Sequence, residues 1–132
     1  MVRGRVVHQR GPNDCGVAVV VMVAGVTYEQ ALAAVFPRKV PKPNQMWTSS
    51  RQLAAALKRL GIKCDERARP LFGRSYKDLE HDAILLVDRD PKTWSWHWVY
   101  WIAKSKRLYD PAIRPRKASR LRCTSFLQIY RD

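Results

Sequence analysis

The stretch GPNDCGVAVVVM, residues 11–22, places a cysteine between a turn and a run of valines. Valine favours strands, so propensity alone would make this segment a strand. Asn13 or Asp14 ahead of the run is suited to cap a helix, and Gly25 behind it is suited to end one. These signals favour a helix that is apolar on most sides and therefore buried. In that interpretation Cys15 lies at the N-terminus of a buried helix.

The composition is that of a folded protein without a membrane-spanning segment. Hydrophobic residues make up 46% of the 132 residues, with five tryptophans, which is enough for a core. The longest apolar run, Val17 to Val26, is shorter than the roughly 20 residues that cross a bilayer. No secretory signal is recognisable at the start of the chain. We therefore expect no membrane insertion and a cytoplasmic location.

Three cysteines lie far apart in the sequence, and no CxxC pair is present. This spacing fits reduced thiols better than a zinc site or a disulfide framework. Zinc binding by His81 and its neighbouring acids has no supporting ligand spacing. We therefore expect neither a metal nor a cofactor, and interpret Cys64 and Cys123 as structural thiols.

Charge is the strongest compositional signal. Lys and Arg number 25 against 11 acids, which gives a net charge of +14 and an attraction to polyanions and acidic protein surfaces. Near the C-terminus a basic run is either a solvated surface or an anion-binding face made by Arg114, Arg116, Lys117, Arg120 and Arg122. Nucleic acid is therefore a candidate partner. However, no nucleic-acid-binding motif is present, and we expect strand alternation to bury every second aromatic of residues 95–102.

The order of elements predicts an α+β fold in a single domain, residues 1–132. Capping boxes at Thr27–Gln30 and Ser49–Gln52 each open an amphipathic helix, and a Pro- and Lys-rich loop over residues 37–45 separates them. Strands are expected at residues 83–87, 95–102, 107–110 and 126–130. The helical part therefore covers about residues 9–61, and an antiparallel sheet covers about 62–132.

Cys15 is the first candidate for chemistry. A thiol nucleophile must be deprotonated near neutral pH, and needs a base and donors for an oxyanion. A helix N-terminus supplies a favourable dipole, and the Cys15 N–H is itself a candidate oxyanion donor. Gly16 would let a substrate approach closely. Alone, however, such a cysteine is more often a small core residue.

His97 is the candidate base, and the expected hairpin tests whether Asp110 can orient it. With an even-length turn of two or four residues, the two residues lie either directly opposite each other or diagonally on the same face. A three-residue turn would put them on opposite faces and exclude the pairing. An even-length turn is therefore required.

In their order and spacing these residues resemble a known family. Gln9-x5-Cys15-Gly16-x-Ala18-x3-Met22, an amphipathic helix ending at Gly61, then His97-Trp-Val and Asp110-Pro111 are similar to the C39 family of papain-like cysteine peptidases. This family includes the domains that cleave double-glycine leader peptides in bacteriocin exporters. The resemblance spans about residues 9–112.

The resemblance implies a papain-like fold and a role for each matching residue. Cys15 would be the nucleophile, His97 the general base and acid, and Asp110 the residue that orients the histidine. Gln9 would donate its side-chain amide to the oxyanion hole beside the Cys15 N–H. Trp96 and Trp98, which flank the histidine, would narrow a substrate groove or fill it.

The leading hypothesis is therefore a small thiol peptidase acting on a peptide or protein that is acidic or associated with nucleic acid. A deamidase or a transglutaminase would use the same triad. The alternative is a catalytically silent papain-like module, an inhibitor or adaptor, that recognises an acidic protein or a nucleic acid through its basic surface. The sequence does not define an oligomeric state.

Overall fold

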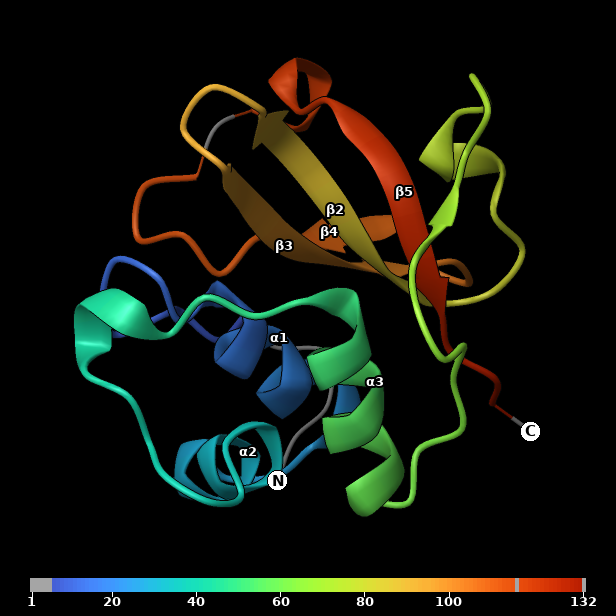
Figure 1. The fold of residues 1–132 in the computed structure, drawn as a ribbon. Coiled ribbons are helices and arrows are strands. Elements are labelled where there is room, and N and C mark those ends of the chain that lie inside the picture. Colours follow the sequence, from blue (N-terminus) through green and yellow to red (C-terminus); the bar gives the residue numbers. More distant parts are fainter. Residues whose placement is uncertain (1–5, 116, 132) are drawn as a thin grey trace.

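The computed structural model describes residues 6–115 and 117–131, which form a layer of helices packed against a sheet (Figure 1). The helices are α1 (Cys15–Ala24), α2 (Tyr28–Val35) and α3 (Ser50–Arg59), with 3₁₀ turns η1 (Pro43–Gln45), η2 (Tyr76–Asp78) and η3 (Ala118–Arg120). The strands are β1 (Arg69–Pro70), β2 (Ala83–Asp90), β3 (Ser95–Ile102), β4 (Arg107–Tyr109) and β5 (Cys123–Gln128). They pair antiparallel in the order β1-β5-β2-β3-β4. The predicted α+β class is confirmed.

The valine run is the helix α1 and lies at the centre of the molecule. Gly25 ends it with φ at 67°, a left-handed conformation that glycine adopts without strain, and its N–H donates to the Val21 carbonyl at 2.9 Å. Every residue from Cys15 to Val23 is buried, because α1 contacts α2, α3 and β3. Burial on all sides therefore makes a helix of a sequence whose propensities favour a strand.

Both predicted capping boxes are confirmed. At the start of α2 the Gln30 N–H donates to the Thr27 hydroxyl, and the Gln30 side chain accepts from the Thr27 N–H. Ser49 and Gln52 make the same reciprocal pair at the start of α3. These local contacts satisfy N–H groups that have no partner within the helix, so the sequence alone predicts both helix starts.

The expected burial of alternate residues in β3 is wrong for its second half. The four residues from Trp98 to Trp101 are all buried, because both faces of the strand are covered. Trp98 and Tyr100 belong to the core shared with the helices. Trp101 belongs to a second core on the other face, where its ring meets Tyr76 of η2 edge-on at 5.1 Å between centroids.

Two strands extend beyond their predicted ends. β2 continues to Asp90 and β5 begins at Cys123, and their pairing shifts register between Leu86 and Val87. Beyond the shift, the Asp88 N–H donates to the Arg122 carbonyl at 2.9 Å, while the Arg122 N–H donates to the Asp88 carboxylate at 3.1 Å. A bulge of this kind leaves no periodic pattern in the sequence.

Within residues 6–115 and 117–131, no single helix is both long enough and apolar enough to cross a bilayer. The pair α1 and α2 would reach the length together, but it is bent by 115°.

Candidate active site

Cys15 is the first residue of α1, and only 3% of its surface is exposed. Contacts between α1 and β3 bring this helix end to the strand that carries His97. Cys15 lies close enough to the imidazole to help raise the pKa of His97. The nucleophile and base expected from the sequence are therefore neighbours.

The His97 Nε2 and the Asp110 Oδ1 lie 2.6 Å apart. Their pairing follows from the β3–β4 hairpin, in which Tyr100 pairs with Tyr109 and Ile102 with Arg107. The connection between these strands has the even length that the pairing requires, and it sets His97 diagonal to Asp110 on one face. The hairpin geometry expected from the sequence is therefore present.

The imidazole lies between two groups that favour its protonated form. Burial alone would lower the pKa of His97, but hydrogen bonds and charge interactions with Asp110 and Cys15 outweigh burial and raise it from 6.5 to about 9. For the carboxyl of Asp110, burial alone would raise the pKa. The pKa is nevertheless lowered, mainly by the hydrogen bonds from His97 and from the Ala112 N–H at 2.9 Å. At pH 7 the pair is therefore an imidazolium next to a carboxylate.

The loop over residues 6–14 runs beside the chain that follows Asp110. The Gln9 N–H donates to the Pro111 carbonyl at 2.8 Å, and the His8 Nδ1 lies 3.1 Å from the Ala112 carbonyl. Figure 1 shows this loop and the connection after β4 at the same end of the molecule. Gln9 therefore lies between the turn that leads to Cys15 and the residues that adjoin Asp110.

The side chain of Gln9 is held by its own loop. Its Nε2 donates to the Gly11 carbonyl at 2.8 Å, which leaves one N–H of the amide for another acceptor. Its Oε1 is buried and has no hydrogen-bond partner among the described residues. A buried polar atom without a partner is uncommon in proteins.

Gly16 and Trp98 are both buried, so of the two roles expected for Trp98, narrowing a substrate groove or filling it, the structure fits the second. Gly16 is buried in α1, where a Cβ would overlap the hydroxyl of Thr48 and lie 3.1 Å from the Leu53 side chain. Only 2% of Trp98 is exposed. Thr48 anchors both flanking tryptophans, because its carbonyl accepts from the indole N–H of Trp96 at 3.0 Å and of Trp98 at 3.3 Å. These positions are occupied by packing between the layers.

Trp96 alone of the expected groove residues remains half-buried at the surface. Its ring is tilted against Trp47 with centroids 5.7 Å apart, and Trp47 is 38% exposed. Trp47 was not singled out from the sequence, because its neighbour lies far along the chain. Together they form an aromatic pair at the surface, and Trp96 directly precedes His97 in β3.

The basic run lies in the connection between β4 and β5 that begins after Asp110. Its described members are exposed: Arg114, Lys117, Arg120 and Arg122. Arg116 lies outside the described residues. The chain that follows Asp110 therefore presents positive charge at the surface.

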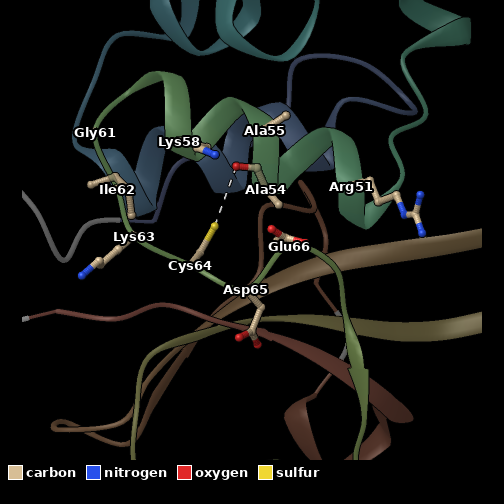
Figure 2. Close-up of a pocket in the computed structure, with 10 residues that line it drawn as sticks. All are labelled: Arg51, Ala54, Ala55, Lys58, Gly61, Ile62, Lys63, Cys64, Asp65 and Glu66. Atoms are coloured by element: carbon tan, nitrogen blue, oxygen red, sulfur yellow. Dashed lines mark hydrogen bonds between the residues drawn. The ribbon is translucent and has the colours of Figure 1, made fainter.

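Two cavities in the described structure differ in how they lie relative to the candidate site. A groove of about 480 Å³ lies between α3 and residues 61–66, and of the described residues that line it none is a predicted catalytic residue (Figure 2). There the Cys64 thiol donates to the Ala54 carbonyl at 3.8 Å, and burial raises its pKa to about 11. A smaller cavity of about 280 Å³ reaches Asp110 and is lined by His8 and apolar side chains. The groove beside α3 is thus separate from the candidate catalytic residues, whereas the smaller cavity adjoins one of them.

In the described part of the chain, the side-chain geometry offers no possible metal-binding site. No group of three or more His, Cys, Asp or Glu side chains converges there in a way that could hold a metal ion. All three cysteines are unpaired among residues 6–115 and 117–131. The described site thus offers a thiol, an imidazole and a carboxylate.

Comparison with family models finds no match for this chain, and comparison with curated proteins finds none either. The resemblance to the C39 family therefore rests on the sequence motifs alone.

Proposed function

We propose that this protein is a papain-like thiol hydrolase that cleaves a peptide bond with Cys15, His97 and Asp110. The observation that carries the proposal is the 2.6 Å contact between His97 and Asp110, on an imidazole whose protonated form Cys15 also stabilises. The helix layer would supply the nucleophile and the sheet the base, as in a papain-like fold. A reducing compartment such as the cytoplasm would keep the thiol reduced.

In the proposed reaction the Cys15 thiolate attacks the carbonyl carbon of the substrate. The carbonyl oxygen becomes an oxyanion that the Cys15 N–H and the Gln9 amide stabilise. His97 then gives its proton to the leaving amine, while Asp110 holds the ring. Water, activated by His97, releases the acid from the thioester and restores the thiol.

Alkylation by iodoacetamide between about pH 5 and 9, mapped at each cysteine by mass spectrometry, tests the thiolate–imidazolium pair. We expect Cys15 to react at pH 5–6 at least about tenfold faster than the other two cysteines. Cys64 and Cys123 are internal controls, because burial raises the pKa of their thiols to about 11 and about 12. His97→Ala should remove the fast reaction at acid pH.

A result in which Cys15 reacts no faster than Cys64, or reacts equally without His97, would exclude the proposed mechanism. Peptidase, deamidase and transglutaminase activities share the acyl-enzyme. They are separated by the product: a cleaved peptide, a glutamate in place of glutamine, or an isopeptide bond.

The burial of Cys15 and the filled positions of Gly16 and Trp98 favour a second candidate, a papain-like module that binds without catalysis. Its exposed cations would contact an acidic protein or a nucleic acid. Cys15→Ala would leave such binding intact, whereas it abolishes the hydrolase. Binding of nucleic acid would show a steep loss of affinity as salt rises.

A further inference from the structure

Asp14 precedes the nucleophile and is almost fully buried, with 1% of its surface exposed. It occupies the N-cap position of α1, yet in the described structure its side chain makes no capping hydrogen bond to that helix. The carboxylate turns back to the preceding loop instead. Its Oδ2 accepts from the Arg10 N–H at 2.8 Å, and its Oδ1 accepts from the Gly11 N–H at 2.8 Å.

A third donor completes this set. The Tyr28 hydroxyl at the start of α2 donates to the Asp14 Oδ2 at 2.7 Å. Burial, and then the bond to Asp14, raise the pKa of Tyr28, so it stays a donor throughout the neutral range. The Arg10 guanidinium covers the Tyr28 ring at 3.8 Å. A buried carboxylate is tolerated when such charge-assisted bonds surround it, and they fix the loop in return.

Gly11 links this carboxylate to Gln9. Its N–H is held by the Asp14 Oδ1, and its carbonyl accepts from the Gln9 Nε2 at 2.8 Å. A carbonyl only accepts, so this bond sets which way the Gln9 amide is turned. The same orientation leaves the Gln9 Oε1 buried and without a partner among the described residues. The loop therefore imposes the orientation against a cost at the amide oxygen.

We propose that Asp14 is a positioning residue of the proposed acyl transfer: through Gly11 it orients the Gln9 amide toward the oxyanion that forms beside Cys15. The inference rests on the proposed function, and it assigns the acid before the nucleophile a role other than helix capping. Asp14 contacts neither the thiol nor the imidazole in this arrangement.

Two reactions of the same thiol separate positioning of the oxyanion donor from general damage. With p-nitrophenyl acetate the Cys15 sulfur bonds to the carbonyl carbon, an oxyanion forms, and p-nitrophenolate leaves to give S-acetyl-Cys15; water then releases acetate. With iodoacetamide the sulfur displaces iodide at a saturated carbon, and no oxyanion forms. A misplaced oxyanion donor should therefore slow only the reaction with p-nitrophenyl acetate.

Asp14→Asn is the principal variant, because the amide nitrogen cannot accept from a loop N–H. We expect acylation to fall about 10- to 100-fold while alkylation of Cys15 changes less than about twofold. If Asp14 acts through Gln9, Asp14→Asn should cost less than about twofold further in a Gln9→Ala background. Tyr28→Phe removes the third bond that fixes the Asp14 carboxylate and so loosens its hold on Gly11. It should slow acylation about 3- to 10-fold and serves if Asp14→Asn does not fold.

The outcomes separate this inference from the function on which it rests. Wild-type Cys15 that is acylated no faster than Cys64 and Cys123 overturns both. Two results would overturn the positioning role alone, provided that wild-type Cys15 is acylated. In the first, Asp14→Asn slows acylation and alkylation equally. In the second, Asp14→Asn slows acylation as much in the Gln9→Ala background as in the wild type. If Asp14→Asn does not fold, an unchanged acylation rate in Tyr28→Phe overturns the positioning role.

Discussion

At the scale of single residues, the protonation of His97 is the most informative property of the site. Its pKa is raised from 6.5 to about 9, so the folded chain holds this proton more tightly than the unfolded chain. The resulting stabilisation is fully present below about pH 6.5 and is lost as pH rises through about 9. Relative to His97→Gln, the free energy of unfolding of the wild type should therefore decline across that window in urea titrations.

Asp110→Asn tests how the proton is held. The asparagine lacks the charge that stabilises the imidazolium, so the titration midpoint of His97, followed by NMR of its ring, should fall by about 1–3 pH units. The interaction with Cys15 would remain. An unchanged midpoint would show that Asp110 does not govern the state of the ring.

The pairing of His97 and Asp110 was predictable because a hairpin offers few registers, and a turn of even length places both residues on one face. Asp14 was predicted only as a helix cap. Its actual partners are Tyr28 and two loop N–H groups, and no local pattern shows that a carboxylate will turn toward them. Residue types therefore predict chemistry better than they predict orientation.

At the scale of elements, capping predicts more than propensity does. The two capping boxes and Gly25 identify the helices, including a valine-rich α1 that propensity would assign to a strand. The burial of β3 could not be predicted, since the second layer that covers Trp101 comes from residues about η2 with no regular pattern. Alternating hydrophobicity identifies a strand with one buried face, but it does not reveal a strand that is buried on both faces.

Gly16→Ala is the prediction that belongs to this scale. Alanine is normally favoured over glycine in a helix by about 1 kcal/mol. Here the added Cβ would overlap the Thr48 hydroxyl and crowd Leu53, and such overpacking costs about 1–3 kcal/mol. We expect net destabilisation in thermal unfolding. Thr48→Ala removes the hydroxyl, so the double variant should recover part of the loss; a stabilised single variant would contradict the close packing of α1 on this segment.

At the scale of the whole molecule, the helix and sheet layers are joined by polar contacts at separate places. Near the candidate active site, the indoles of Trp96 and Trp98 on β3 donate to the carbonyl of Thr48 ahead of α3. At the far end of α1, Arg131 donates to the Val23 carbonyl at 2.8 Å and to the Asp82 carboxylate at 3.1 Å. The last described residue of the chain therefore fastens the end of the central helix to the sheet.

Arg131→Lys should weaken this second junction without touching the site. A lysine cannot reproduce the planar fork that reaches Asp82, the Tyr100 hydroxyl and the helix end together. We expect a loss of about 1–3 kcal/mol in the free energy of unfolding, with the alkylation rate of Cys15 unchanged in the folded protein. Arg69→Lys is the matched control, since Arg69 also makes two side-chain hydrogen bonds but is half exposed, and it should lose less than about 1 kcal/mol. Equal losses in both variants would contradict a special contribution of Arg131 to this junction.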